Sequence, residues 1–363
     1  MREKLMEICA AFRIPGNLSA WEELKVGNIN KTYKVTFTRD NGFEKAYIVQ
    51  RLNTHVFRNP EQVMENIERV TRHLRALRPG QVNLHFHHTR EGKNFVWEGE
   101  HFWRLFNYVS SADAANDRDE TLVRNAGAAF GDFQNALSGF DPSQLHETIP
   151  DFHNTIKRYA ALEEALQHNP ASRADEVKQE AQWLMQAKDK ACVLCDLLKH
   201  GELPLRVTHN DTKVNNVLFD QKDKRALVVI DLDTVMPGLA GNDFGDAIRS
   251  VSNTAAEDEK DVGKVSCDLQ LFRCFTEGFL EKTAKSFTAK EIETFGASCF
   301  SMTVEVAVRF LTDYLQGDTY FHCAYPEHNL VRTRAQIALA QDMQRKMDEM
   351  NRIVAECAAK YRA

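Results

Sequence analysis

The hydrophobic positions of the first sixty residues change from a helical period to a strand period. Apolar residues recur at helical spacing over residues 3–12, which predicts a short amphipathic helix. From Trp21 onward the period is two, and apolar and polar side chains alternate over residues 33–38, as in a half-buried strand. Asp40-Asn41-Gly42 is a hairpin turn signal, so residues 44–52 are expected to return as the next strand.

The next segment predicts a helix and a further pair of strands. A helix is expected from Pro60, because proline suits the first turn and apolar residues follow along one stripe. Residues 95–97 and 103–106 have strand character. Residues 107–116 are small and polar, and we interpret them as the joint between two lobes.

Beyond this joint the pattern is mostly helical. Helices are expected over residues 119–138, 155–168, 172–200 and from 267 onward, with one β stretch over residues 205–230. The fold class is therefore α+β with two lobes: a β-rich lobe with one helix (residues 1–107) and a mainly helical lobe (residues 108–363).

Composition excludes several classes of protein. The chain has 363 residues, 43% of them apolar and 27% charged, with a net charge of −6. Its basic residues are scattered among acids, so we expect no nucleic-acid partner. No segment approaches the roughly 20 apolar residues that span a bilayer, and the N-terminus lacks a signal-peptide pattern, so we expect no membrane partner and a cytoplasmic location.

The one cysteine pair with a suggestive spacing is Cys192-x-x-Cys195. A zinc or redox site needs a second pair or a nearby histidine cluster, and the sequence shows neither. We interpret the pair as small hydrophobic residues on a helix face.

The segment that carries chemistry reads His209-x-Asp211-x-Lys213-x-x-Asn216, followed by a strand, a turn and a second strand. The carboxylate of Asp211 can accept the proton of an alcohol, and Lys213 can neutralise charge on a phosphoryl group. His209 is expected mainly to brace the loop by hydrogen bonds. The alternative, a polar turn between buried strands, explains a lone His-x-Asp better than it explains the full pattern.

The second strand ends in Asp231-Leu232-Asp233, 20 residues after Asp211. Magnesium prefers hard oxygen ligands. Asn216 and Asp231 are therefore the predicted metal ligands, with Asp233 as a possible further one.

This loop and the Ile-Asp-x-Asp strand end resemble the aminoglycoside phosphotransferase and choline kinase superfamily. The resemblance implies a protein-kinase-like fold, ATP and Mg²⁺ as cofactors, and Asp231 in the place of the metal-binding Asp of the kinase Asp-Phe-Gly motif. A literal Asp243-Phe244-Gly245-Asp246 comes too late to be that motif. The resemblance gives Asp246 the structural role of holding the catalytic loop.

Longer blocks narrow the similarity to N-acetylhexosamine 1-kinases. These blocks are RVTHNDTKVNN, VIDLDTVMPG, DFGDAIR, RFLTDYLQGDTYF and YPEHNLVRTR, with AFGDFQN near residue 130. The resemblance implies transfer of the ATP γ-phosphoryl group to the anomeric hydroxyl of GlcNAc or GalNAc. It also implies sugar contacts by Arg309 and Tyr320. Asn28, where the related enzymes often carry His, and His209 complete the candidate substrate set.

The candidate nucleotide contacts lie in the first lobe. The turn over residues 26–33, with Gly27 and Asn30, can lay backbone N–H groups over phosphates. The strand in the place of the one that carries the ATP-pairing Lys of protein kinases, residues 47–52, has no Lys here. Either Gln50 or Arg51 replaces it, or that contact is absent. Glu65 and Glu68 are possible partners of that residue or solvated helix positions. The joint supplies the remaining candidates, Asn107, Tyr108 and Val109.

Several functions remain open at this point. An aminoglycoside, choline or homoserine kinase would share the catalytic loop. A pseudokinase that acts only as a binding module would fit the missing strand Lys, but not the intact Asp211, Lys213, Asn216 and Asp231.

Overall fold

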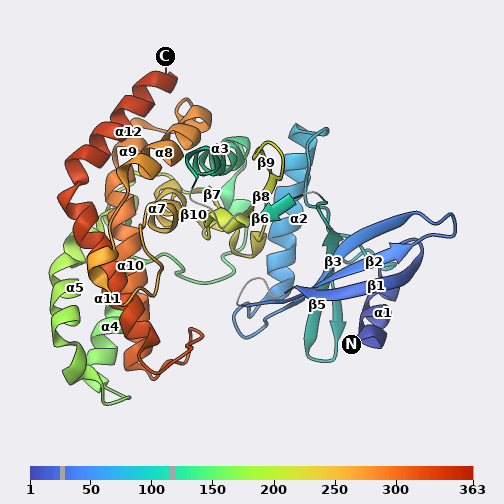
Figure 1. Ribbon diagram of the computed structural model, residues 1–363, viewed down its shortest axis with the longest axis horizontal. Helices are drawn as coiled ribbons and strands as arrows, with labels where there is room; N and C mark the ends of the chain where they lie inside the picture. The colour runs from blue at the N-terminus through green and yellow to red at the C-terminus, as the bar shows by residue number, and fades with distance from the viewer. Residues whose placement is uncertain (25–28, 111, 115–118, 363) are drawn as a thin grey trace. The chain divides into compact units, whose positions relative to one another are not determined.

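The computed structural model describes residues 1–24, 29–110, 112–114 and 119–362, and these form two compact units (Figure 1). The first unit comprises Met1–Ala112, Ser143–Pro150 and Ile230–Met236. The second comprises Asp113–Pro142, Asp151–Val229 and Pro237–Ala363. Two segments from later in the chain thus join the β-rich unit, and one of them contains Asp231 and Asp233.

The first unit is built on an antiparallel sheet with the strand order β1-β2-β3-β5-β4. Its strands are β1 (Asn17–Leu24), β2 (Lys31–Thr38), β3 (Glu44–Leu52), β4 (Val96–Glu98) and β5 (His101–Asn107). The period of two in the sequence is confirmed, since Tyr33, Val35 and Phe37 of β2 are all buried. The predicted bounds of the strand over residues 44–52 match those of β3.

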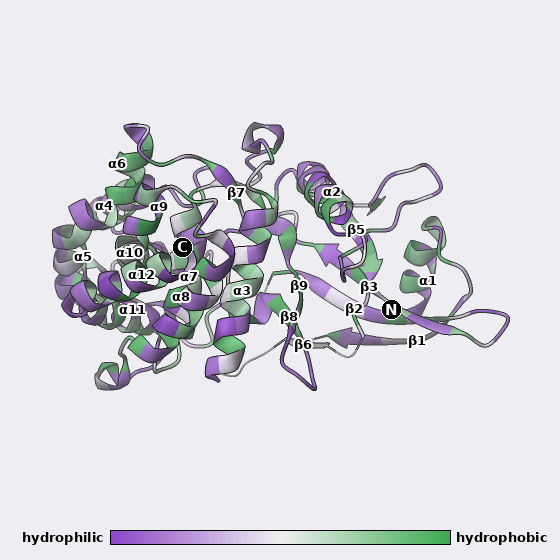
Figure 2. Cartoon of the chain, turned by 90° about the horizontal axis from the view of Figure 1, so that it is seen from above, coloured by the Kyte–Doolittle hydropathy of each residue, from purple (hydrophilic) through white to green (hydrophobic). Residues whose placement is uncertain are grey.

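Two helices pack with this sheet. In α1 (Arg2–Ala11), Leu5 and Ile8 are buried in the same core as Val35. In α2 (Pro60–Leu77), Pro60 opens the helix as predicted, and the buried residues include Val63 and Ile67. Figure 2 shows hydrophilic and hydrophobic residues alternating along α2, as expected of a helix with one buried face.

The second unit is mainly helical, which confirms the predicted α+β class. Its helices are α3 (Glu120–Ala136), α4 (Thr155–His168), α5 (Lys178–Ala191), α6 (Val193–Lys199), α7 (Ala240–Val251), α8 (Leu269–Thr283), α9 (Ala289–Glu293), α10 (Phe295–Leu315), α11 (His328–Arg345) and α12 (Met347–Arg362). The segment over 172–200, predicted as one helix, is divided into a 3₁₀ turn, α5 and α6. The sequence reading missed α7 altogether.

Short strands accompany these helices. β8 (Val217–Asp220) lies between β6 (Ala112–Ala114) and β9 (Ala226–Val229), and β7 (Arg206–Thr208) pairs with β10 (Met236–Gly238). They place the chemistry-bearing loop between β7 and β8.

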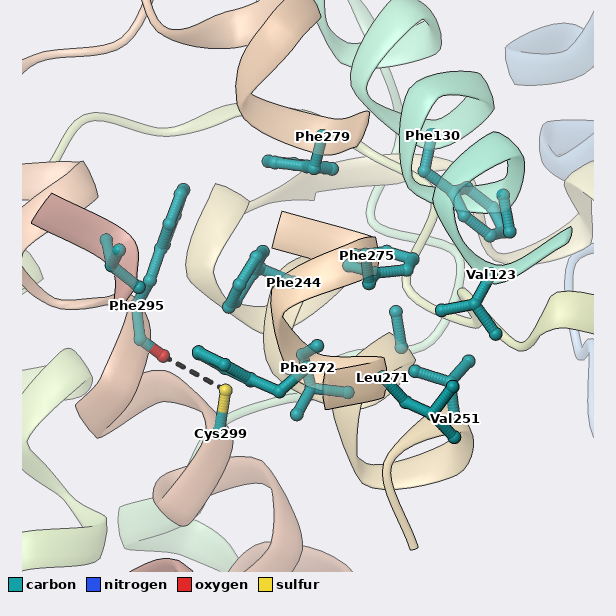
Figure 3. Close-up of a cluster of buried hydrophobic side chains, with 14 of the residues drawn as sticks. Val123, Phe130, Phe244, Val251, Leu271, Phe272, Phe275, Phe279, Phe295 and Cys299 are labelled. Atoms are coloured by element: carbon teal, nitrogen blue, oxygen red, sulfur yellow. Dashed lines mark hydrogen bonds between the residues drawn. The ribbon is translucent and has the colours of Figure 1, made fainter. Parts of the chain in front are cut away.

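Helix α7 runs through the core of the second unit. Phe244 is fully buried and stacks on Phe295, with ring centroids 4.3 Å apart. Figure 3 shows Phe272, Phe275 and Phe279 gathered around it. Because this Asp-Phe-Gly lies inside a helix, it matches the kinase motif in letters only.

Glycines let the helices around α7 approach closely. A Cβ added at Gly245 of α7 would lie 2.5 Å from the carbonyl oxygen of Ser298 in α10. A Cβ at Gly278 of α8 would lie 2.0 Å from the carbonyl oxygen of Arg124 in α3. Both distances are below ordinary contact, so the close packing of α3, α7, α8 and α10 requires these glycines.

The remaining sequence expectations concern membranes and cysteines. Among the residues described, no helix combines the length and apolar character needed to cross a bilayer. Cys192 is buried and Cys195 partly buried, and neither forms a disulfide. Their interpretation as packing residues agrees with this placement.

Candidate active site

The loop after β7 is held by a buried carboxylate from α7. Oδ2 of Asp243 accepts a hydrogen bond from the backbone nitrogen of His209 (2.9 Å), and its Oδ1 accepts one from that of Asn210 (2.7 Å). Asn210 has a φ of +64°, in the left-handed region that asparagine tolerates better than most residues other than glycine. Asp243 thus stabilises the turn that presents Asp211. Burial raises the pKa of Asp243.

A second carboxylate of α7 holds the other side of Asp211. Asp246 accepts a hydrogen bond from the backbone nitrogen of Thr212 (3.0 Å) and pairs with Arg249 (2.9 Å). Burial alone would raise the pKa of Asp246, but Arg249 and Lys213 outweigh burial and hold that pKa below its usual value. The structural role expected for Asp246 is confirmed, and Asp243 shares it.

Asp211 itself contacts two other candidate residues of its own loop, Lys213 and Asn216. Nζ of Lys213 is 3.0 Å from its Oδ1, and Nδ2 of Asn216 donates to its Oδ2 (3.0 Å) and to its backbone oxygen (2.8 Å). The Asp211 carboxylate is the first cause of the raised pKa of Lys213, so this side chain carries a positive charge at neutral pH. With its amide nitrogen turned to Asp211, Asn216 has its amide oxygen as the donor that a metal ion could use.

His209 belongs to the framework of the loop rather than to a substrate surface. It is fully buried, and its ring meets Phe130 and Phe133 of α3 edge-on at 5.6 and 5.9 Å. Its Nδ1 accepts a hydrogen bond from the backbone nitrogen of Asp211 (3.3 Å). A side chain without exposed surface cannot touch a substrate, so we remove His209 from the substrate set and keep its bracing role.

His153 and Glu305, which were not anticipated from the sequence, form a buried pair that contacts the Asp211 loop. Nδ1 of His153 is 2.8 Å from Glu305 of α10, and its Nε2 is 3.3 Å from the carbonyl oxygen of Asn210. Thr155 also donates to Glu305 (2.7 Å). Burial alone would raise the pKa of Glu305, but His153 and Thr155 outweigh it, so that pKa lies below the usual value.

Arg309, one turn of α10 beyond Glu305, is surrounded by aromatic rings. Its guanidinium carbon lies 5.2 Å from the ring centroid of Phe152, 5.5 Å from that of Phe321 and 5.9 Å from that of Tyr320. Tyr320 is 57% exposed. The two residues that the resemblance assigned to the sugar are therefore neighbours, and an exposed ring lies beside a cation.

The loop with Tyr320 is shaped by one buried carboxylate at the end of α10. Asp313 accepts hydrogen bonds from three successive backbone nitrogens, those of Thr319, Tyr320 and Phe321, at 2.8–2.9 Å. The amide of Asn329 also donates to it, at 2.8 Å. Asp313 thus fixes the backbone from which Tyr320 projects.

In the first unit, the predicted metal-binding strand end is a tight turn. Asp231 has a φ of +59° and precedes a 3₁₀ turn, Leu232–Thr234. Asp233 in that turn is buried, and its carboxylate pairs with Arg104 and accepts a hydrogen bond from Asn30 (2.8 Å). Because protein cations and amides already occupy both of its oxygens, we no longer count Asp233 among the metal ligands.

Gln50 and Arg51, the two candidates to replace the missing strand Lys, have different partners in the structure. Gln50 faces Arg104 of the neighbouring strand β5, and its Oε1 accepts a hydrogen bond from Nε of Arg104 (3.0 Å). Arg51 points the other way, and its guanidinium is 3.4 Å from His101. Glu65 is half exposed and pairs with Arg69 of its own helix, as a solvated helix position would. Glu68 pairs with Arg72 of the same helix but is only 17% exposed. The buried cation of this sheet is Arg104, which sequence reasoning missed.

The other nucleotide candidates remain predictions. Gly27 and Asn28 lie outside the described residues. Asn107 ends β5 and accepts a hydrogen bond from the backbone nitrogen of His85 (2.6 Å). The ring of Tyr108 lies 4.8 Å from Nζ of Lys34, and Val109 is buried.

The metal ligands predicted from the sequence are oxygen donors. Among residues 1–24, 29–110, 112–114 and 119–362, no group of three or more His, Cys, Asp or Glu side chains is arranged to hold a metal ion. Magnesium bound together with phosphates needs only one or two protein oxygen ligands. Asp231 in the first unit offers a carboxylate and Asn216 in the second an amide oxygen, and their role as metal ligands remains a prediction.

Comparison with known proteins identifies the family. The family model described as "Phosphotransferase enzyme family" (APH) matches residues 20–264, more than half of the chain. The protein is a member of this phosphotransferase family. Among the described residues, the match includes the Asp211 loop, the Asp231 turn and the α7 carboxylates.

Solved structures share the fold of this phosphotransferase. An aminoglycoside phosphotransferase from Alicyclobacillus acidocaldarius is similar with a TM-score of 0.63 at 13% identity, over 96% of each chain. A microcompartment-associated aminopropanol kinase has a TM-score of 0.61 at 14% identity, over 97% of this chain and 99% of its own. Choline kinase from Cryptosporidium parvum has a TM-score of 0.59 at 13% identity, over 96% and 97%. These likenesses establish the fold of the phosphotransferase and leave its acceptor open.

Proposed function

We propose that this phosphotransferase transfers the γ-phosphoryl group of ATP to the anomeric hydroxyl of an N-acetylhexosamine, GlcNAc or GalNAc, and releases ADP. The observation that carries the proposal is the setting of Arg309. Its guanidinium lies among three aromatic rings, one of which is that of the exposed Tyr320. An arginine can donate to the oxygens of an acetamide or a hydroxyl, and a tyrosine offers a ring face and a hydroxyl to a sugar.

The charge near Arg309 favours an acceptor rich in oxygen over a cationic one. Arg158 donates to the carbonyl oxygen of Phe152 (2.8 Å), the residue whose ring faces Arg309. Burial, and then the charge of Arg309, lower the pKa of Arg158. Two arginines that affect each other would repel a choline or aminoglycoside cation, whereas Glu305 nearby is already paired with His153.

Asp211 is suited to take the proton of the acceptor. An anomeric hydroxyl is more acidic than an ordinary sugar alcohol, so a carboxylate suffices as the base. As O1 bonds to the γ-phosphorus, the bond from that phosphorus to the ADP oxygen breaks and the O1 proton passes to Asp211. Lys213, next to this carboxylate, is suited to neutralise charge on the transferred group.

Magnesium would be held by Asp231 and by the amide oxygen of Asn216. When bound, it neutralises charge on the ATP phosphates. The α7 carboxylates, Asp243 and Asp246, hold the Asp211 loop in place.

A substrate screen tests the proposal. The protein is incubated with ATP, magnesium and a panel containing GlcNAc, GalNAc, choline, homoserine and an aminoglycoside, and ADP release is followed. The expected product is a hexosamine 1-phosphate, in which the phosphorus couples to the anomeric proton in NMR. A 6-phosphate product, or turnover of only the amine acceptors, would overturn the acceptor assignment. Nucleotide binding without any turnover would favour a binding module.

A further inference from the structure

A buried cation of the first unit lies on β5, and not on the strand that carries the Lys of kinases. Gln50 of β3 lies opposite Arg104 of β5 in the sheet register. Arg104 is only 2% exposed, and its guanidinium carbon lies 5.6 Å from the ring centroid of Phe86. A buried guanidinium is costly unless its donors are paired.

The partners of Arg104 lie within the first unit. Its Nε donates to Gln50 (3.0 Å), which in turn donates from Nε2 to Thr32 of β2 (2.9 Å). Its Nη1 donates to Asp233, which is 3% exposed. Since these contacts engage its donors inside the protein, Arg104 is placed to hold other residues rather than to bind phosphate.

Asp233, which is paired with Arg104, contacts two candidate functional segments: the turn that contains Asp231 and the segment that contains Asn30. It is two residues beyond Asp231, in the turn in which Asp231 adopts its left-handed conformation. Its second oxygen accepts a hydrogen bond from Asn30 (2.8 Å), and Oδ1 of Asn30 accepts one from the backbone nitrogen of Asn53 (2.9 Å). The other end of the turn is held by Asn66 of α2, which donates to the carbonyl oxygen of Val235 (3.0 Å).

We propose that Arg104 and Asp233 are positioning residues that hold Asp231 in its metal-binding conformation and fix Asn30, the candidate nucleotide contact that directly precedes β2. In this chain, a strand-to-turn ion pair takes over the bracing task for which kinases use a strand Lys and a helix Glu. The inference rests on the proposed use of ATP and magnesium, but not on the identity of the acceptor.

Matched variants distinguish a positioning role of Arg104 and Asp233 from two alternatives: that Asp233 is itself a metal ligand, or that the pair only stabilises the fold. Arg104→Met removes the charge at similar volume, Asp233→Asn keeps the shape of the carboxylate, and Arg104→Lys restores the charge. Lys4→Met is the control for loss of another ion pair of the same unit, that between Lys4 and Glu98. Val35→Ala, in the sheet core, is the control for lost stability alone.

Two measurements are made on each full-length variant without acceptor. The first is the unfolding midpoint of each variant without nucleotide. It is also measured for the double variant that combines Arg104→Met and Asp233→Asn. The second is calorimetric binding of ADP over a range of magnesium concentrations. The KM values for ATP and for the acceptor are then measured separately.

We expect Arg104→Met and Asp233→Asn each to raise the magnesium concentration for half-maximal ADP binding by about tenfold, the usual effect of losing a residue that orients a metal ligand. The KM for ATP should rise while that for the acceptor stays unchanged. Arg104→Lys should recover part of the loss. The double variant should be destabilised by less than the sum of the single variants.

Two results would overturn the inference. If Asp233→Asn abolishes magnesium-dependent binding while Arg104→Met leaves it unchanged or improves it, Asp233 is itself a metal ligand. If both variants lose binding only in proportion to lost stability, as Val35→Ala does, the pair is purely structural. A wild-type protein that binds ADP with magnesium but phosphorylates no hexosamine would refute the acceptor and leave this inference intact.

Discussion

The backbone nitrogen of Asn210 donates a hydrogen bond of 2.7 Å to Oδ1 of Asp243. This contact joins the residue before the candidate base to a helix 33 positions further along the chain. It helps to hold Asn210 in its left-handed conformation, which asparagine tolerates better than most residues. The catalytic loop therefore depends on α7 for its shape.

Replacing Asp243 tests this dependence. Asp243→Ala leaves two backbone N–H groups buried without an acceptor, so the free energy of unfolding should fall by about 3 kcal/mol and turnover should fall as well. The matched control is Asp342→Ala, which removes a buried carboxylate that accepts from the backbone nitrogen of Cys267 (2.7 Å). That control should lose stability but keep its turnover per folded molecule. Equal turnover in the two variants would contradict the role of Asp243.

Asp211→Asn tests the base. The substitution keeps the shape of the side chain and removes the charged acceptor, so turnover should fall by roughly 10²–10⁴-fold. Binding of ATP should change little, because Lys213 and Asn216 remain in place. Steady-state kinetics with a nucleotide titration measures both quantities. Near-normal turnover would show that another group accepts the proton.

Asp231→Ala tests the metal site. Loss of its carboxylate should abolish turnover and weaken nucleotide binding only when magnesium is present. Calorimetry with and without EDTA distinguishes these two conditions. A variant with the wild-type magnesium requirement would place the metal ion elsewhere.

Arg309→Ala tests the acceptor site. Loss of a charged donor should lower kcat/KM for the hexosamine by about 10–100-fold, with the KM for ATP unchanged. Arg334→Ala is a suitable control, because Arg334 is a partly exposed arginine that pairs with Glu180. An equal effect of both substitutions would remove Arg309 from the acceptor site.

The first unit should lose stability in acid because of His87. Burial, and then His85, lower the pKa of His87 from 6.5 to about 4. Between these two values the unfolded chain binds a proton at this ring and the folded chain does not, so stability should fall as the pH falls from about 6.5 to 4. Denaturant unfolding at several pH values should show a smaller fall in His87→Phe. An identical fall in this variant and in a variant of the exposed His168 would contradict the assignment.

The sequence predicted those parts of the molecule in which local pattern and structure agree. The strand over residues 44–52 and the Asp211 loop are examples, since alternation and residue spacing are local signals. Helix α7 was missed because Gly241 and Gly245 lower its helix propensity, yet Gly245 is needed for the close approach of Ser298.

Arg104 was missed for a different reason. It is a charge in the middle of an apolar strand, and its partner Asp233 lies 129 positions away. No local pattern reveals that pairing. The same holds for His153 and Glu305, which are 152 positions apart.

The Asp313 carboxylate has a consequence for how acceptor preference could change. The loop over residues 319–321 takes its shape from backbone N–H groups that bind a residue outside the loop. Because these hydrogen bonds come from backbone nitrogens, they do not depend on which side chain stands at position 320. Enzymes with new acceptors could therefore be selected by varying this short segment, while the helix that supports it stays the same.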